Sequence, residues 1–292
     1  MIDRRNMLLS LAALAACADG ARHPSGRAPP HPDFGPVLRS LGAGARLGVA
    51  ALDTGSGRAV GHDQHGRYAM ASTFKLGLAA AVFAEVDRGA ITLEQELALS
   101  PSDMLSNAPV AEAALARGRL SFAEMCDAIV VVSDNVAANM LLRHIGGPAA
   151  LTAFFRRCGD RVTRLDRYEL ELNSNLPDDP RDTTTPAAMV GLMRAILIGE
   201  ALTPTMRGNL VSAMERCVTG RDRLRAGLPG AWRAGDKTGT GARGASNDIA
   251  FAVPPGRPPI LIASYVDAPE ATPAARNAGH AWVARLVAEA FA

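Results

Sequence analysis

The amino-acid sequence predicts an α+β fold, in which an antiparallel five-stranded sheet flanked by helices carries an inserted all-helical domain. Two observations predict this arrangement. Strand-like runs bounded by Gly and Pro lie near both ends of the chain, and the long segment between them has apolar residues at helical spacing. With 292 residues, of which 48% are hydrophobic and 21% charged, the chain is long enough to bury a sizeable core.

The sheet is expected from five short segments at the two ends of the chain. The first two are joined by the turn Thr54-Gly55-Ser56-Gly57, and the last three are separated by Gly and Pro. The predicted strands are 46–53, 58–68, 231–237, 248–253 and 260–266.

The helices are expected between and after these strands. Ser72 is expected to cap the start of the first. The predicted helices are 72–86, 121–140, 185–198 and a closing helix at 271–291. Asn, Pro and Asp interrupt the pattern at 163–184, which we expect to form a long ordered loop. Residues 33–70 and 215–292 would then form the sheet domain and 71–214 the helical domain, with the active site where they meet.

The start of the chain predicts export. Arg4 and Arg5 precede an apolar run at 7–16 that is too short to span a membrane. The run ends in Leu14-Ala15-Ala16-Cys17, which resembles a lipoprotein processing site, and the paired arginines resemble a twin-arginine signal. We expect a signal at 1–17, a flexible tether at 18–32 and a periplasmic protein that contacts a membrane only through lipidated Cys17. The alternative is an ordinary signal whose removal discards Cys17.

Composition excludes several classes of function. The net charge of +2, the absence of a basic block and the 4% aromatic content give no support for nucleic-acid binding. No spacing of His or Cys resembles a metal site, so we expect neither a metal nor another cofactor. We expect Cys126, Cys158 and Cys217 to be buried thiols, and the protein to be a monomer.

The choice of basic residues is unusual. Only two of the 31 basic residues, Lys75 and Lys237, are lysines. An arginine cannot lose its proton at accessible pH, whereas a lysine amine can. Either codon bias favours arginine throughout the chain and these two lysines remain by chance, or their positions require a titratable amine.

The first candidate motif is Ser72-Thr73-Phe74-Lys75. Residues three apart share one face of a helix, so Lys75 is expected to point at the Ser72 hydroxyl. Serine becomes a nucleophile when a neighbouring base removes its proton, and a lysine can do this once burial lowers its pKa. Alone the motif is weak, because about one S-x-x-K is expected by chance in a chain of this size.

The second motif is Ser133-Asp134-Asn135, which follows an apolar helical stretch. The Ser133 hydroxyl could relay a proton to a leaving nitrogen, and the Asn135 amide could hold a substrate carbonyl. The alternative is a helix end at which Ser133 and Asp134 act as caps.

The third motif is Lys237-Thr238-Gly239, followed by Thr240, at the end of a predicted strand. Lys237 would supply a fixed cation, and Gly239 would let substrate approach the backbone closely. The backbone N–H groups of Thr240 and Ser72 could form an oxyanion hole. The alternative is an ordinary strand end and turn.

Together and in this order, S-x-x-K, S-D-N and K-T-G resemble the signature of class A β-lactamases and penicillin-binding proteins. The resemblance runs from about residue 35 to the C-terminus. It implies a serine β-lactamase-like fold and hydrolysis of β-lactam substrates through an acyl-serine intermediate. It leaves open a penicillin-binding carboxypeptidase, and a non-catalytic penicillin-sensing lipoprotein.

A fourth motif, Glu169-Leu170-Glu171-Leu172-Asn173, resembles the E-x-x-L-N element of class A β-lactamases. The carboxylate of Glu169 and the amide of Asn173 could grip one water between them, and that water would attack the acyl-Ser72 ester. Glu171 is expected to be solvated. The resemblance does not settle whether Lys75 or Glu169 activates Ser72 for acylation.

Further implications follow from the resemblance alone. Arg167 and Asp182 would form the ion pair that pins the loop, and the peptide bond after Glu169 would be cis. Ser246 stands where many members have an arginine, so the guanidinium fork of Arg223 would bind the substrate carboxylate instead.

The remaining departures from the family concern disulfides and the cleft mouth. Ala71 and Gly241 stand where some members have paired cysteines, and Ala79 stands where Cys126 would find a partner. Asn107 replaces an aromatic residue and would open the cleft mouth. Thr240 together with Arg223 is similar to members with broader cephalosporin or carbapenem activity.

Overall fold

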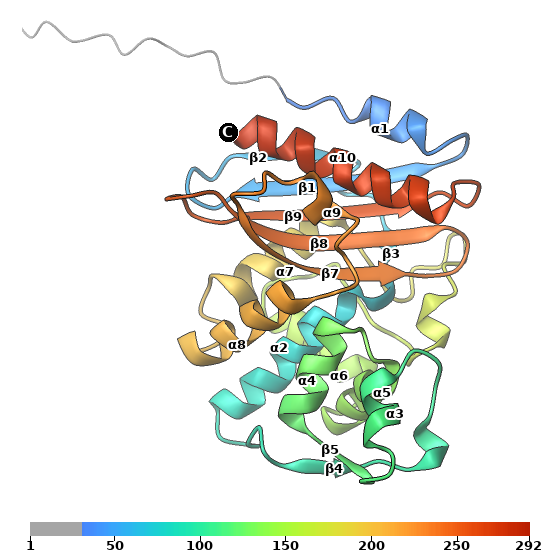
Figure 1. Cartoon of the computed structure of the whole chain (residues 1–292), viewed down its shortest axis with the longest axis vertical. Helices are drawn as coiled ribbons and strands as arrows, with labels where there is room; N and C mark the ends of the chain where they lie inside the picture. Colours follow the sequence, from blue (N-terminus) through green and yellow to red (C-terminus); the bar gives the residue numbers. More distant parts are fainter. Residues whose placement is uncertain (1–30) are drawn as a thin grey trace, which may run out of the picture. The chain divides into compact units, whose positions relative to one another are not determined.

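A five-stranded antiparallel sheet, assembled from both ends of the chain, organises the computed structural model, which describes residues 31–292 (Figure 1). Its strand order is β2-β1-β9-β8-β7. The strands are β1 (Arg46–Asp53), β2 (Ala59–His62), β7 (Arg233–Thr240), β8 (Ala245–Val253) and β9 (Ile260–Asp267). β1 pairs with β9 along its whole length, from Arg46 opposite Asp267 to Asp53 opposite Ile260. The predicted fold class is confirmed.

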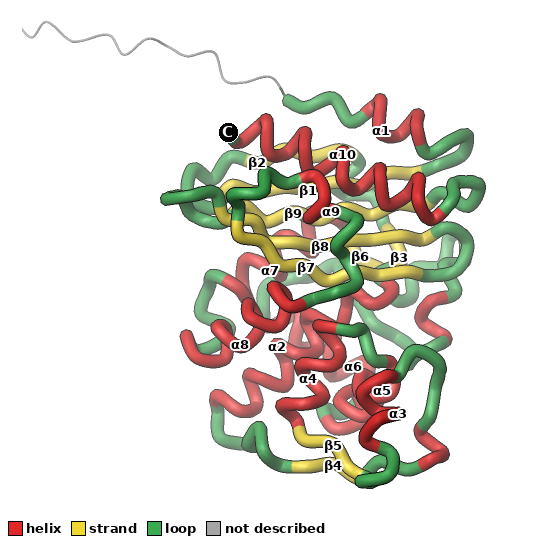
Figure 2. Tube along the Cα trace, in the orientation of Figure 1, coloured by secondary structure: helices red, strands yellow, loops and turns green. Residues whose placement is uncertain are grey.

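The two faces of the sheet bury two separate hydrophobic clusters. Side chains alternate between faces along a strand, so Ile260 and Ile262 of β9 join one cluster while Leu261 and Ala263 join the other. Three helices cover the first face: α1 (Gly35–Ser40), α9 (Leu224–Gly227) and α10 (Pro273–Phe291). Figure 2 shows α1 and α10 along this side of the sheet.

The helical block covers the second face. Its helices are α2 (Phe74–Asp87), α3 (Pro109–Ala114), α4 (Phe122–Val131), α5 (Asn135–His144), α6 (Pro148–Arg157), α7 (Pro186–Leu197) and α8 (Pro204–Arg216). Two short strand pairs accompany them: β3 (Tyr68–Ala69) with β6 (Thr183–Thr184), and β4 (Glu96–Ala98) with β5 (Arg119–Ser121). Short 3₁₀ turns span Ala71–Thr73, Pro101–Asp103 and Glu171–Asn173.

Helix α2 runs through the centre of the block. It is apolar all round, and every residue from Phe74 to Phe83 is buried, including Lys75 in its first turn. Gly77 permits close packing, because a Cβ there would lie 2.5 Å from the Phe155 ring. A charged amine in this position requires polar partners nearby.

The structure corrects three predicted elements. The helix expected at 121–140 is two helices, because the backbone at Ser133 is left-handed (φ 61°) and Asp134 then caps α5 by accepting from the N–H of Ala137. The strand expected at 58–68 divides into β2 and β3, which belong to different sheets. The strand expected at 231–237 runs from Arg233 to Thr240, so the whole K-T-G motif lies within β7.

The loop at 163–184 and the helix beginning at Pro186 are confirmed. Residues 31–292 form one compact unit, and the division into sheet and helical domains stays a prediction. The predicted signal at 1–17, the lipidated Cys17 and all but the last two residues of the tether at 18–32 lie outside the described residues. Within the described range, no helix combines the length and the apolar character that crossing a membrane requires.

Candidate active site

A cleft of about 820 Å³ gathers most of the predicted site residues. The segments that form it are the turn before α2, the loop before α3, the break between α4 and α5, the loop at 163–184, the connection between α8 and α9, and the end of β7 with the turn after it. Its lining includes Ser72, Asn107, Ser133, Asn135, Leu170, Glu171, Asn173, Thr219, Arg223, Thr238 and Thr240. Segments far apart in the sequence therefore meet at one site.

Ser72 lies in the 3₁₀ turn that leads into α2. The prediction that Ser72 caps this helix is wrong, because no side chain caps the start of α2. The turn is held from the sheet side, where the Asn247 amide donates to the carbonyls of Ala69 and Met70 at 2.9 and 3.0 Å. A Cβ on Gly239 would lie 2.6 Å from the Met70 carbonyl oxygen. The glycine of K-T-G is therefore required by the chain's own backbone, and not only by an approaching substrate.

The Lys75 amine is completely buried, and among the described residues its partners are Glu169, Ser133 and Asn135 rather than the Ser72 hydroxyl. It forms an ion pair with Glu169 Oε1 at 2.9 Å and donates to the Ser133 carbonyl at 2.9 Å and to Asn135 Oδ1 at 2.5 Å. Burial is the main influence on this amine and lowers its pKa, while the charge of Glu169 opposes the shift.

The Ser133 hydroxyl lies between the two lysines of the chain. The amine of Lys237 donates to it at 3.1 Å and that of Lys75 at 3.4 Å. Burial first, and the nearby charge of Lys75 second, lower the pKa of Lys237 to about 7. The role of Lys237 as a fixed cation stays a prediction.

Glu169 and Asn173 meet directly, because the Asn173 amide donates to Glu169 Oε2 at 2.6 Å. The Oδ1 atom of Asn173 is buried and has no hydrogen-bond partner among residues 31–292. It is therefore an acceptor available to a small molecule beside the carboxylate. Glu171 is exposed, as predicted.

Asn139, which the sequence analysis missed, fixes the backbone of Glu169. Its amide donates to the Glu169 carbonyl at 2.9 Å and accepts from the Glu169 N–H at 3.0 Å. The peptide bond between Glu169 and Leu170 is cis, as the resemblance implied. No local signal marks Asn139, because it lies in the middle of an ordinary helical segment.

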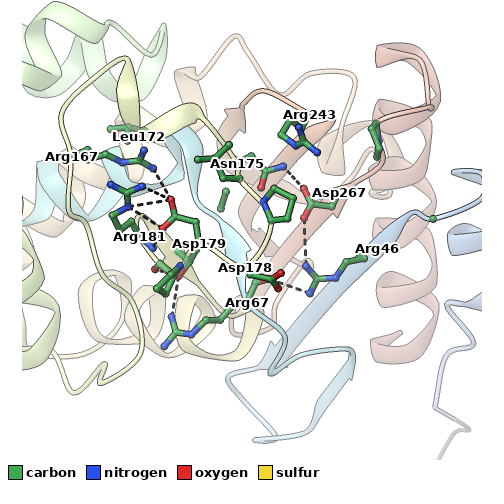
Figure 3. Close-up of a pocket in the computed structure, with 17 residues that line it drawn as sticks. Arg46, Arg67, Arg167, Leu172, Asn175, Asp178, Asp179, Arg181, Arg243 and Asp267 are labelled. Atoms are coloured by element: carbon green, nitrogen blue, oxygen red, sulfur yellow. Dashed lines mark hydrogen bonds and ion pairs between the residues drawn. The ribbon is translucent and has the colours of Figure 1, made fainter.

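The loop is pinned as predicted by Arg167 and Asp182, whose Nε and Oδ2 atoms lie 2.6 Å apart. The other oxygen of Asp182 accepts from the backbone N–H groups of Asp166 and Arg167. On the side of the loop away from the cleft, Arg167 and Arg181 approach Asp179 (Figure 3).

Arg223 reaches the cleft, where most of its donors already have partners in the protein. Nη1 donates to the carbonyls of Gly239 and Asn247, and Nε donates to Asn277 Oδ1. Nη2 donates to Thr240 Oγ1 at 2.7 Å. Because each terminal nitrogen carries two hydrogens, Nη2 has one left for a ligand, and any carboxylate would be shared with Thr240.

The other predicted substrate-binding groups also line the cleft. The Asn135 amide donates to the Ser106 carbonyl at 2.8 Å, so one N–H remains for substrate. Thr238 contacts Thr219, a residue that the sequence analysis missed, with 2.6 Å between the hydroxyl oxygens. These roles in substrate binding stay predictions.

The structure also places the departures from the family. A Cβ on Gly241 would lie 3.7 Å from that of Ala71, which is within disulfide geometry. Cys126 and Cys217 are buried free thiols, as predicted, while Cys158 is half-buried. Asn107 donates to the Ser133 carbonyl at 2.9 Å. Within residues 31–292 no group of His, Cys, Asp and Glu is arranged to hold a metal, and the expectation of a cofactor-free site stays a prediction.

Comparisons with known proteins show which family the chain belongs to. A family model described as the beta-lactamase enzyme family matches residues 37–291. Beta-lactamase AST-1 of Nocardia asteroides is 43% identical over 249 residues, 85% of this chain and 80% of the relative. The carbapenem-hydrolyzing beta-lactamase KPC of Klebsiella oxytoca is 42% identical over 247 residues, 84% of this chain and 84% of the relative.

Solved structures of the same family are also similar to this chain. An ancestral (GNCA) class A beta-lactamase matches with a TM-score of 0.85 and 49% identity, covering 89% of this chain and 100% of its own. Because the family model spans most of the chain and relatives named as beta-lactamases align with most of it, the hydrolase interpretation is confirmed over a non-hydrolytic penicillin binder. The chain belongs to the beta-lactamase enzyme family and is a class A serine β-lactamase that hydrolyses β-lactams through an acyl-serine intermediate.

Proposed function

We propose that Ser72 is the nucleophile, that Lys75 and Glu169 together activate it, and that Glu169 then activates the hydrolytic water. The observation that carries this proposal is the buried ion pair between Lys75 and Glu169, whose atoms lie 2.9 Å apart beside the turn that holds Ser72. A carboxylate and an amine in contact can exchange a proton, so either can receive the one that Ser72 loses.

In the acylation step, Ser72 Oγ forms a bond to the β-lactam carbonyl carbon while its proton passes to the Lys75–Glu169 pair. The backbone N–H groups of Ser72 and Thr240 stabilise the developing oxyanion. The carbon–nitrogen bond of the ring then breaks, and the leaving nitrogen takes a proton from the Ser133 hydroxyl. The amines of Lys75 and Lys237, at 3.4 and 3.1 Å, can replace that proton.

In the deacylation step, a water adds to the ester carbon and gives its proton to Glu169. The unpaired Oδ1 of Asn173 accepts the second hydrogen of that water and orients it. Ser72 Oγ then leaves with a proton, and the enzyme returns to its starting state after one water has been consumed.

Steady-state kinetics of the purified protein test the activity and its range. A penicillin, two cephalosporins and a carbapenem are the informative substrates, since the relative from Klebsiella oxytoca is named for carbapenem hydrolysis. We expect many turnovers per enzyme molecule with the chromogenic cephalosporin. A single turnover followed by a lasting adduct would contradict the proposed deacylation.

The catalytic efficiency should fall with rising pH through about 7 for substrates that carry a carboxylate. Burial lowers the pKa of Lys237 to about 7, so the free enzyme loses this cation above that pH and attracts an anionic substrate less. The measurement is kcat/KM from pH 5.5 to 9. Lys237→Arg keeps its charge throughout and should move the alkaline limb upward; an unmoved limb would exclude Lys237 as its origin.

Replacing Arg223 by alanine should raise KM about 10-fold for substrates with a carboxylate, because a charge-assisted hydrogen bond contributes roughly 1.5–3 kcal/mol. The effect on kcat should be smaller, since Arg223 does not touch Ser72 or Glu169. Asp222→Ala, an exposed neighbour, is the matched control. An unchanged KM for such substrates would argue against this role.

We further propose that the protein is exported to the periplasm, anchored through lipidated Cys17, and monomeric. The support is the sequence at 1–17, since one acylated cysteine holds a protein at a membrane surface without a spanning helix. Cys17→Ser should release the activity from the membrane fraction, and light scattering should give the monomer mass. Activity that is already soluble in the unaltered protein would exclude the anchor.

A further inference from the structure

The back of the loop at 163–184 faces a cavity of about 770 Å³ (Figure 3). Most loop side chains that line it are polar, and Leu176 is 48% exposed. Only Leu172 among them is a buried apolar residue. Residues 174–181, in the second half of the loop, are half-buried or exposed, so polar contacts rather than packing against the core position them.

Asn175 makes the polar contacts that connect this half of the loop to the sheet. Its amide donates to Asp267 Oδ1 at 2.7 Å and to the Ala242 carbonyl at 3.3 Å. Asp267 ends β9 and in turn faces Arg46 of β1, with 3.5 Å between Oδ2 and Nη1. Figure 3 shows Asn175, Asp267 and Arg46 in line along one side of the cavity.

The turn between β7 and β8, which contains Ala242, also holds Asn173, the residue that contacts Glu169. The Ala242 N–H donates to the Asn173 carbonyl at 2.8 Å, two residues before Asn175. The side chain of Asn173 donates to Glu169 Oε2 at 2.6 Å. The contacts of Asn175 with the sheet therefore lie only two residues along the chain from the contact of Asn173 with Glu169.

We propose that Asn175 is a positioning residue for deacylation, which acts with Asp267 to hold the Glu171–Asn173 turn so that the Asn173 amide stays on Glu169. This anchor is distinct from the ion pair of Arg167 and Asp182, which joins the two ends of the loop. The inference rests on the proposed role of Glu169 in activating water.

The backbone of the loop offers a matched pair of variants. Asn175 has a left-handed conformation (φ 43°), which Asn and Gly accept more readily than other residues, so Asn175→Gly removes the amide without adding strain. Asp178 in the same loop is also left-handed (φ 59°), and its side chain makes no hydrogen bond or ion pair with the described residues. Asp178→Gly is therefore the same kind of change without the lost contacts.

The experiment measures acylation and deacylation separately, by stopped-flow absorbance and by the acyl-enzyme fraction in intact mass spectra. We expect Asn175→Gly to slow deacylation about 3- to 10-fold, as the loss of one or two hydrogen bonds predicts, and to change acylation less than twofold. The acyl-enzyme fraction should rise accordingly. Asp178→Gly should match the unaltered protein in both steps.

Variants of the acceptor complete the test. Asp267→Ala should reproduce the slow deacylation, Asp267→Asn should restore it because its amide oxygen still accepts from Asn175, and the Asn175→Gly/Asp267→Ala double variant should be no slower than either single one.

Equal behaviour of Asn175→Gly and Asp178→Gly, or equal slowing of both chemical steps, would overturn the proposal. Glu169→Ala, run alongside, keeps the two hypotheses apart: if it still turns over quickly, the role of Glu169 fails, whereas a trapped Glu169→Ala with a normal Asn175→Gly refutes the positioning role alone.

Discussion

Replacing Glu169 by alanine is expected to trap the enzyme as an ester on Ser72 and to lower kcat by about 10²- to 10⁴-fold, the usual contribution of a general base. The variant retains the Ser72 turn and Lys75, so some acylation should persist while the hydrolytic water lacks its base. Intact mass spectrometry after mixing with a penicillin should show the enzyme shifted by the mass of one substrate molecule.

Glu171→Ala is the control for this variant. It removes the same type of carboxylate two residues away, at an exposed position on the rim of the cleft, and should turn over at nearly the normal rate. A Glu169→Ala enzyme that hydrolyses penicillin at the normal rate would remove Glu169 from the mechanism.

Replacing Lys75 by arginine should slow acylation about 10²- to 10⁴-fold. The charge is retained, but the guanidinium cannot give up a proton and is larger than the fully buried amine that it replaces. Stopped-flow traces should lose the burst, and mass spectra should show no adduct, which distinguishes this variant from Glu169→Ala.

The same substitution at the other lysine provides the comparison. Lys237→Arg keeps the cation that the proposed role at 237 requires, so its acylation rate should fall much less than that of Lys75→Arg. Thermal unfolding of both variants reports whether the larger side chain disturbs the buried site. Normal acylation by a folded Lys75→Arg protein would show that no titratable amine is needed at this position.

Local sequence pattern predicted much of the fold and the central part of the site. The strand at 46–53 is an apolar run followed by turn residues, and the helix that follows Thr185 has apolar residues at helical spacing after a cap signal; the structure has both. The S-x-x-K motif lies at the start of α2, S-D-N between α4 and α5, K-T-G near the end of β7, and the fourth motif in the loop at 163–184. The break at Ser133 was expected only as the alternative interpretation of S-D-N, a helix end with Ser133 and Asp134 as caps; in the structure Ser133 is left-handed and Asp134 caps α5.

The missed residues are mainly asparagines that act across the fold. Asn139, Asn175 and Asn247 each hold backbone or side-chain groups of a distant segment, and such contacts leave no periodic or motif signal. The contacts of the Arg223 fork within the protein were missed for a related reason. Its donors are used by carbonyls of β7 and β8, which become neighbours of Arg223 only when the strands pair.

The pairing of β1 with β9 has a consequence for how the protein acquires its structure. Their partners are separated by more than 200 residues, from Asp53 opposite Ile260 to Arg46 opposite Asp267. A growing polypeptide therefore cannot close the sheet, or bring β7 to the Ser72 turn, until nearly all of it has been synthesised. Contacts this distant along the chain slow folding and leave partly folded states exposed. Chains that end prematurely before β9 would lack the strand that joins the two halves of the sheet, so activity should emerge only with the complete polypeptide.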